Sequence, residues 1–250
     1  MFATIVSPTS LFWNSNTMPK KHFTQRLMLP LMLLALFALM DSAQAALRVA
    51  CVGDSITYGV NLPPDQTYPA DLQRSLGPNA IVKTFAFPGL SLLSLPNGNP
   101  PYHPAYTSTL YYQQALQFNP NVVIIMLGTN DGSFTFATGQ NWNQVYGHQF
   151  TDQYTALVDH FRQLPSHPQV FLATCPTVFG VNQYAINPGI VNNTVTPYIV
   201  KIGHAVHVPL VDVRRATAPY SADFGDKVHP NPHGAMVIAQ AVYLALKNKI

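Results

Sequence analysis

The amino-acid sequence predicts an α/β fold built on a five-stranded parallel sheet. Five short apolar runs alternate along the chain with longer amphipathic stretches, an order that favours a parallel sheet with right-handed helical crossovers. The third run, NVVIIML at 121–127, is apolar almost without interruption, as expected of a parallel strand covered on both faces. The 250 residues, 48% of them apolar, are enough for one domain with a substantial core.

Each element of this fold has its own signal in the sequence. The strand runs are short and most end at glycine, proline or a polar residue. The last helical stretch carries a mostly apolar stripe, whereas Gly189 and Pro197 leave the start of the fourth one undefined. We expect strands at 47–52, 80–87, 121–127, 170–174 and 208–213, and helices at 68–76, 107–118, 144–164, 187–206 and 233–247.

The N-terminal segment has the pattern of a signal peptide. Basic residues at 20, 21 and 26 precede an apolar run at 27–40, which is shorter than the ~20 residues that a membrane-spanning helix needs. Small residues at 42–46 then predict cleavage after Ala45. We therefore expect a leader and signal peptide at 1–45, a single domain at 46–250, and a secreted or periplasmic protein without stable membrane insertion after cleavage. An uncleaved N-terminal anchor is the alternative.

Charge and cysteine content limit the classes of partner. Without the leader the chain has ten basic and nine acidic residues, a net charge of about +1. A nucleic-acid partner would require a clustered basic face, and the sequence does not indicate one. The chain contains no Glu, so every carboxylate available for catalysis is an Asp. Cys51 and Cys175 lie in apolar runs, which favours two buried free thiols over a disulfide.

Chemically useful side chains follow the predicted strands. Ser55 comes after the first strand, Gly89 after the second and Asn130 after the third, whereas Asp226 and His229 lie between the fifth strand and the last helix. Because functional groups gather at the carboxyl ends of parallel strands, we expect these residues to meet at one edge of the sheet.

Together these residues supply the parts that acyl transfer needs. Ser55 is the candidate nucleophile, His229 the base that takes its proton, and Asp226 the group that orients the imidazole. The backbone N–H groups of Ser55 and Gly89 and the side-chain N–H of Asn130 are the candidate oxyanion-hole donors. The reaction needs no cofactor, and we expect no metal: Pro230 and Pro232 prevent a regular helix from bringing His229 and His233 to one face.

These blocks resemble the SGNH hydrolase family, also called GDSL esterases and lipases. Gly53-Asp54-Ser55, Gly89, Gly128-Thr129-Asn130-Asp131 and Asp226-x-x-His229 match its four blocks in order, over about residues 47–247. The resemblance implies a flavodoxin-like three-layer α/β/α sandwich, the SGNH hydrolase fold, and no metal cofactor. Two departures stand out. The second block, Thr84 to Gly89, lacks the family's usual Asn and first Gly, and Lys227 stands where the family often has Gly.

Other interpretations of the same residues exist. Ser55 could only cap a helix, Asn130 and Asp226 could be turn residues, and Gly89 could serve backbone shape alone. The absence of Gly-x-Ser-x-Gly argues against an α/β-hydrolase nucleophile elbow. Several aromatic residues could pack within loops or line a substrate groove above Ser55. They are Tyr102, Tyr106, Tyr111, Tyr112, Trp142 and Tyr146.

The sequence therefore predicts an exported serine esterase that hydrolyses short-chain, chiefly acetyl, esters by a Ser-His-Asp acyl-enzyme mechanism. The resemblance favours a carbohydrate ester as substrate, with a small-molecule ester as the simpler case. A periplasmic lysophospholipase or thioesterase is the first alternative, since the apolar stretch LSLLSL at 90–95 could hold an acyl chain. A non-catalytic binding module on the same fold is the second.

Overall fold

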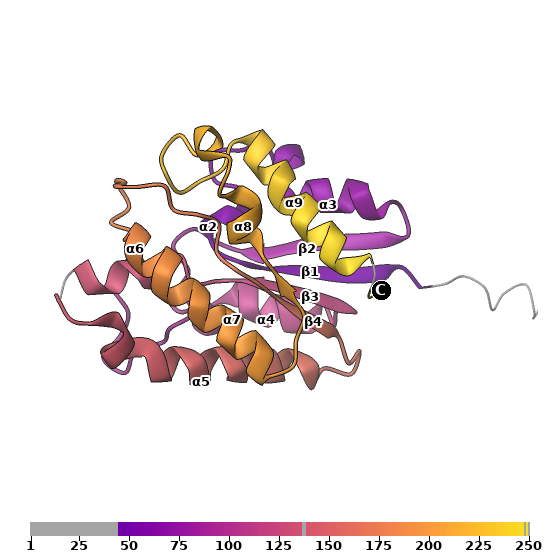
Figure 1. Cartoon of the computed structure of the whole chain (residues 1–250). Helices are drawn as coiled ribbons and strands as arrows, with labels where there is room; N and C mark the ends of the chain where they lie inside the picture. Colours follow the sequence, from indigo (N-terminus) through magenta and orange to yellow (C-terminus); the bar gives the residue numbers. More distant parts are fainter. Residues whose placement is uncertain (1–44, 137–138, 248, 250) are drawn as a thin grey trace, which may run out of the picture. The chain divides into compact units, whose positions relative to one another are not determined.

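Five parallel strands form one sheet in the order β2-β1-β3-β4-β5, which confirms the predicted α/β fold (Figure 1). The order is that of flavodoxin-like sheets. In these sheets the strands are added first to one side of β1 and then to the other, and this switch leaves a crevice at the carboxyl ends of β1 and β3. The strands are β1 (Leu47–Gly53), β2 (Ala80–Ala86), β3 (Val122–Met126), β4 (Gln169–Ala173) and β5 (Leu210–Val211).

The computed structural model describes residues 45–136, 139–247 and 249. Residues 46–250 belong to one structural unit. The predicted signal peptide and its flanking residues, apart from Ala45, lie outside the described residues, so the cleavage site stays a prediction. Within the described ranges, no helix combines the length and the apolar character needed to cross a membrane.

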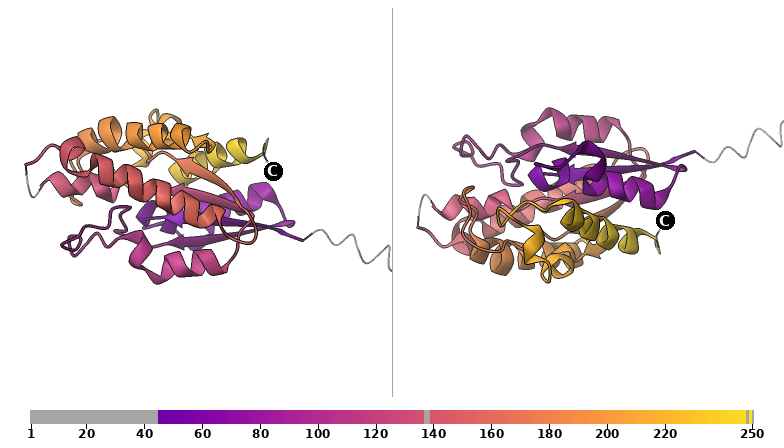
Figure 2. Two further views of the ribbon diagram at one scale, coloured as in Figure 1. Left: turned by 90° about the horizontal axis from the view of Figure 1, so that it is seen from below. Right: turned by 90° about the horizontal axis from the view of Figure 1, so that it is seen from above.

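The helices cover both faces of the sheet, which makes the three layers (Figures 1 and 2). On one face α3 packs beside α9, and on the other lie α4, α5 and α7. The helices are α2 (Ser55–Tyr58), α3 (Tyr68–Leu76), α4 (Leu110–Gln117), α5 (Trp142–Arg162), α6 (Pro188–Ile190), α7 (Thr196–Ala205), α8 (Val213–Thr217) and α9 (Pro232–Leu246).

Alternation along the central strands divides the core in two. In β3, Val123 and Ile125 face the α5 side, whereas Ile124 and Met126 face the α9 side. All five residues of β3 are buried, because helices cover the strand on both faces. This explains the uninterrupted apolar run in the sequence.

Polar caps fix where the main helices begin. The side chain of Thr67 accepts a hydrogen bond from the amide of Ala70 at the start of α3, and that of Asn231 accepts one from Gly234 at the start of α9. The predicted helix at 68–76 agrees with α3, and those at 144–164 and 233–247 agree with α5 and α9 to within two residues.

The fifth strand differs from its prediction. The sequence predicts 208–213, but β5 contains only Leu210 and Val211. The chain leaves the sheet at Asp212, whose carboxylate accepts a hydrogen bond from the amide of Arg215 and starts α8. A helix cap therefore ends the strand before its apolar run does.

The predicted helix at 187–206 is a composite of three segments. The short α6 and α7 flank a π-helical segment, Val191–Val195. Here the amide of Thr196 bonds the carbonyl of Val191, so the wider turn accommodates Pro197, which has no amide hydrogen to give.

Candidate active site

Ser55 lies at the carboxyl end of β1, where the strand turns directly into α2. Asp54 makes this turn by accepting a hydrogen bond from the amide of Ile56 at 3.0 Å. The turn requires glycine at position 53, since a Cβ there would lie 2.0 Å from the side-chain oxygen of Thr57 and 2.9 Å from the carbonyl of Met126. The serine is 7% exposed, so its hydroxyl faces the site from a nearly buried position.

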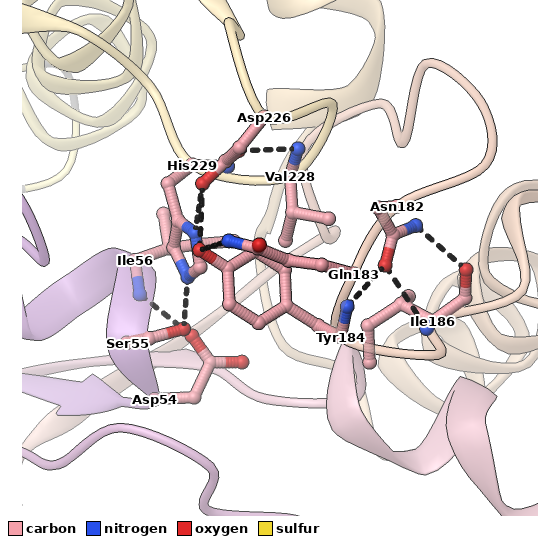
Figure 3. Close-up of polar contacts among 10 residues, drawn as sticks. All are labelled: Asp54, Ser55, Ile56, Asn182, Gln183, Tyr184, Ile186, Asp226, Val228 and His229. Carbon is pink, nitrogen blue, oxygen red and sulfur yellow. Dashed lines mark hydrogen bonds and ion pairs between the residues drawn. The ribbon is translucent and has the colours of Figure 1, made fainter.

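The histidine reaches this serine from the loop that precedes α9. His229 Nε2 lies 2.9 Å from Ser55 Oγ, and His229 Nδ1 lies 2.7 Å from Asp226 Oδ2 (Figure 3). The structure thus brings Ser55, His229 and Asp226 into one continuous chain of hydrogen bonds, the arrangement that a serine nucleophile and its base require.

Asp226 is held in its ionised form by its own loop. Partial burial by itself raises the pKa of this carboxyl. Hydrogen bonds from the amides of His229 (2.7 Å) and Val228 (2.9 Å), and from the imidazole, outweigh that effect and lower the pKa below its ordinary value. Lys227, which lies between Asp226 and Val228, has a φ of 74°. This left-handed conformation is the physical reason why glycine suits that position.

Gly89 lies in a turn after β2 in which the amide of Leu90 bonds the carbonyl of Phe87 at 3.4 Å. Its φ is 84°, and a Cβ at this position would lie 2.3 Å from the carbonyl oxygen of Tyr102. Both facts require glycine here even though the rest of the second block departs from the usual pattern. The turn brings Gly89 to the same cavity as Ser55.

Asn130 follows β3 and is 7% exposed. Its side-chain amide donates one hydrogen bond to the carbonyl of Leu90 at 2.9 Å. An amide carries two N–H donors, and the second has no partner among the residues that the structure describes, so it can meet a ligand. The bond to Leu90 also ties Asn130 to the turn that carries Gly89, so the two candidate oxyanion donors are held together.

These residues surround a cavity of about 460 Å³. Ser55, Gly89, Asn130 and His229 all line it, which brings the predicted nucleophile, base and oxyanion donors to one space. Asp226 stands behind His229. The remaining lining residues are Val60, Pro88, Tyr102, His103, Gln183, Tyr184, Ala185, Ile186 and Val228.

Three residues that the sequence analysis did not single out support the site. Asp131 accepts hydrogen bonds from the amides of Leu92 (3.0 Å) and Leu93 (2.8 Å), and burial raises its pKa to about 6.

His103 lies 3.2 Å from the carbonyl of Gly89, and partial burial lowers its pKa. Tyr184 contacts both Asp226 and His229. Asp131 had a signal, its place in the third block; the other two come from loops without one.

The aromatic residues and the leucine stretch divide between core and cavity. Tyr102 is 84% exposed and lines the cavity, whereas Tyr106 and Trp142 are buried in the core. Leu90, Leu92 and Leu93 are also buried in the core. No leucine of the stretch at 90–95 lines the cavity, so the structure does not support the acyl-chain groove that this stretch suggested for the lysophospholipase alternative.

His233, four residues after His229, belongs to a different pair. Its Nδ1 lies 2.6 Å from Asp223 Oδ2, on the surface at the start of α9. Within the described ranges no group of three or more His, Cys or Asp side chains could hold a metal ion.

Comparison with known proteins identifies the family of the chain. The model of the GDSL-like Lipase/Acylhydrolase family matches residues 51–237. A curated relative, the acetylxylan esterase of Xylanibacter ruminicola, is 28% identical over an alignment of 226 positions, which covers 81% of this chain. The chain spans only 43% of the length of that relative.

Solved structures share the fold at low identity. The aryl esterase of M. smegmatis superposes with a TM-score of 0.66 at 19% identity, over 82% of this chain and all of the other. A carbohydrate acetylesterase family member from Sinorhizobium meliloti gives 0.63 at 16% identity, over 81% of this chain and 98% of the other. The predicted flavodoxin-like sandwich is thus confirmed as the fold of these hydrolases.

Proposed function

Because the chain belongs to the GDSL-like lipase/acylhydrolase family, we propose that it is an exported serine esterase that removes short acyl groups, chiefly acetyl, from a carbohydrate. One observation carries the esterase proposal: the hydrogen-bond chain from Asp226 through His229 to Ser55, with Ser55 and His229 lining the same cavity as Gly89 and Asn130. The family membership and the signal-peptide pattern support the reaction class and the export, respectively.

The reaction follows from these positions. Ser55 Oγ attacks the ester carbonyl carbon while His229 Nε2 takes the hydroxyl proton, and Asp226 stabilises the imidazolium that forms. The amides of Ser55 and Gly89 and the side-chain N–H of Asn130 bind the oxyanion, each such donor contributing about 2.7–4 kcal/mol to lowering the barrier. The proton passes from His229 to the departing alcohol. Water then attacks the acyl-serine in the same way and releases the acid.

The cavity supports a short acyl group and an uncharged alcohol. Its volume is about 460 Å³, and its apolar lining includes small side chains such as those of Val60, Pro88 and Ala185. The lining residues that the structure describes include no lysine or arginine that would bind the phosphate of a lysophospholipid. The similarity to a protein named acetylxylan esterase supports a carbohydrate as the alcohol.

Replacing the nucleophile tests the mechanism. Ser55→Ala should lower kcat by at least about 10³-fold and leave the thermal midpoint nearly unchanged, because the hydroxyl acts in the reaction rather than in the core. Ser94→Ala, at an exposed serine, is the matched control. A fluorophosphonate should label Ser55 in the unmodified protein. Hydrolysis by Ser55→Ala at close to the rate of the unmodified protein would contradict the mechanism, whereas an unmodified protein that neither hydrolyses esters nor is labelled would leave the binding-module alternative.

A series of p-nitrophenyl esters from acetate to palmitate tests the acyl length. The rate should be highest for acetate and fall steadily as the acyl chain lengthens, because the cavity is small. Acetylated xylo-oligosaccharides should release acetate, whereas lysophospholipid should release no fatty acid. A preference for chains beyond about eight carbons would refute the acetyl proposal and favour the lysophospholipase or thioesterase alternative.

A further inference from the structure

Tyr184 makes two contacts with the residues behind the nucleophile. Its hydroxyl donates a hydrogen bond to Asp226 Oδ2 at 3.1 Å, the same oxygen that accepts from His229 Nδ1 (Figure 3). Its ring meets the imidazole edge to face, with centroids 4.8 Å apart and an interplanar angle of 89°. We propose that Tyr184 is a positioning residue that sets the orientation and the basicity of the Asp226–His229 pair. This inference rests on the proposed function.

The hydrogen bonds of Asp226 show what Tyr184 adds. Oδ1 accepts from the amides of Val228 and His229, which belong to the same turn as Asp226 and would move with it. Tyr184 lies 42 residues away in sequence, on the loop that follows β4. Its hydroxyl is therefore the contact that fixes the carboxylate relative to a separate part of the fold.

The loop around Tyr184 is built to hold that side chain in place. Asn182 Oδ1 accepts hydrogen bonds from the amides of Tyr184 and Ile186, both at 3.2 Å, and its Nδ2 donates to the carbonyl of Ile186 at 2.8 Å. Between them Ala185 adopts a left-handed φ of 55°. A non-glycine residue in this conformation persists because the surrounding contacts determine it.

Gln183 orients the hydroxyl itself. Its side-chain amide donates to Tyr184 Oη at 3.0 Å, so the oxygen accepts one bond and directs its hydrogen toward Asp226. A hydroxyl that accepts a hydrogen bond becomes a stronger donor through polarisation. Asn182 thus holds the backbone of Tyr184, whereas Gln183 and Tyr184 form a chain of hydrogen bonds that ends on the carboxylate.

The electrostatic consequence has a definite sign. A second donor on Oδ2 withdraws charge from the oxygen that faces His229, which weakens the stabilisation of the imidazolium. Removing the hydroxyl should therefore favour protonated His229 and move its titration to higher pH. The other titratable groups near the site are Asp54 and Asp131 beneath the nucleophile, Tyr102 and His103 in the cavity lining, and Lys227 next to Asp226. The change leaves all of them in place.

The experiment compares Tyr184→Phe with the unmodified protein. We expect the NMR titration midpoint of His229 to rise by about 0.3–1 pH unit, and the pH at which kcat/KM is half-maximal to rise with it. The plateau of kcat should fall about 2- to 10-fold, as expected for the loss of one hydrogen bond that orients the base. Tyr184→Leu, which also removes the ring, should lower kcat further.

The chain offers a matched control. Tyr220 stands edge to face against His233, which pairs with Asp223, but this trio does not reach Ser55. Tyr220→Phe should leave the titration of His229 and the rate profile unchanged. If Tyr184→Phe does not fold, Gln183→Ala keeps the tyrosine and should shift the midpoint in the same direction by less.

The outcomes separate this inference from the proposed function. An unchanged His229 midpoint in Tyr184→Phe, or an equal shift in Tyr220→Phe, overturns the role of Tyr184 even if the protein is an esterase. A rise in the midpoint supports it even if no ester is hydrolysed, since the NMR measurement needs no substrate.

Discussion

At the residue scale, the two oxygens of the Asp54 carboxyl group have very different surroundings. One oxygen caps α2, whereas the other is buried and has no hydrogen-bond partner among the described residues. Burial, together with repulsion from the nearby Asp131, raises the pKa of Asp54 to about 7. Asp131 is itself buried, with a pKa raised to about 6. Two carboxyl groups beneath the nucleophile therefore keep their protons to a higher pH than an ordinary aspartate does.

The pH dependence of stability follows from these shifts. The folded chain keeps protons that the unfolded chain loses above its ordinary carboxyl pKa of 3.8, so the free energy of unfolding should fall as the pH rises from about 4 to 7. Asp54→Asn keeps the capping oxygen and removes one titration. It should narrow the difference in unfolding free energy between pH 5 and pH 8 by on the order of 1–3 kcal/mol.

Urea unfolding at the two pH values measures this difference. Asp65→Asn, at an exposed carboxyl, serves as the control and should leave the difference unchanged. A difference that is as large in Asp54→Asn as in the unmodified protein would show that Asp54 does not keep its proton.

The sequence predicts the candidate site well where function requires a fixed residue type after a strand. Ser55, Asn130 and the Asp226/His229 pair could be placed because a parallel sheet brings its carboxyl ends to one edge. Tyr184 could not, since its contact with Asp226 depends on a loop whose path Asn182 and Ala185 determine through local hydrogen bonds and backbone conformation.

At the element scale, the π-helical segment Val191–Val195 supports the loop that carries Asn130. A Cβ at Gly132 would lie 2.4 Å from Val191 Cγ2, and one at Gly128 would lie 2.8 Å from Val195 Cγ1. The wider helical turn therefore packs directly against the glycines on either side of Asn130. This contact holds the candidate oxyanion donor from behind.

Adding a methyl group at Gly132, against Val191, should lower both stability and catalytic rate. Gly132→Ala has an ordinary φ but no room, so we expect a loss of about 1–3 kcal/mol in unfolding free energy and a lower kcat as Asn130 shifts. Adding Val191→Ala makes space and should restore part of both, a non-additive result that thermal unfolding and ester kinetics can measure. Gly225→Ala, where a Cβ meets nothing within 4 Å, is the control. Additive losses in the double variant would contradict the contact.

Element prediction worked where one signal dominated and failed where two competed. The helix predicted at 68–76 agrees with α3, where the Thr67 cap of the structure supports the same start. β5 is shorter than its apolar run because the Asp212 cap competes with the strand pattern and wins. The π-helical segment was not predicted, because one extra residue in a single turn is too short an interruption to stand out from the apolar spacing of the sequence.

At the scale of the whole molecule, the two-sided core determines the state of the cysteines. Cys51 belongs to the apolar cluster on the α9 face and Cys175 to the one on the α5 face. Both are free and fully buried, and burial raises the pKa of both thiols, that of Cys51 to about 12. The sheet between them keeps the two thiols apart.

The native protein should therefore behave as a protein without disulfides. A thiol reagent should modify neither cysteine before unfolding and both after it, and reductant should leave the thermal midpoint unchanged. A midpoint that falls on reduction would reveal a disulfide and require a different arrangement of β1 and β4.

The candidate nucleophile and its base are in contact in space but lie 174 residues apart in the sequence, near the two ends of the segment that folds into this unit. During synthesis Ser55 emerges early, whereas His229 arrives only with the segment that leads into α9. Until α9 docks beside α3, the serine hydroxyl has no base and remains an ordinary alcohol. If the predicted signal peptide directs an unfolded chain across a membrane, that chain would have no hydrolytic activity in the compartment where it is made.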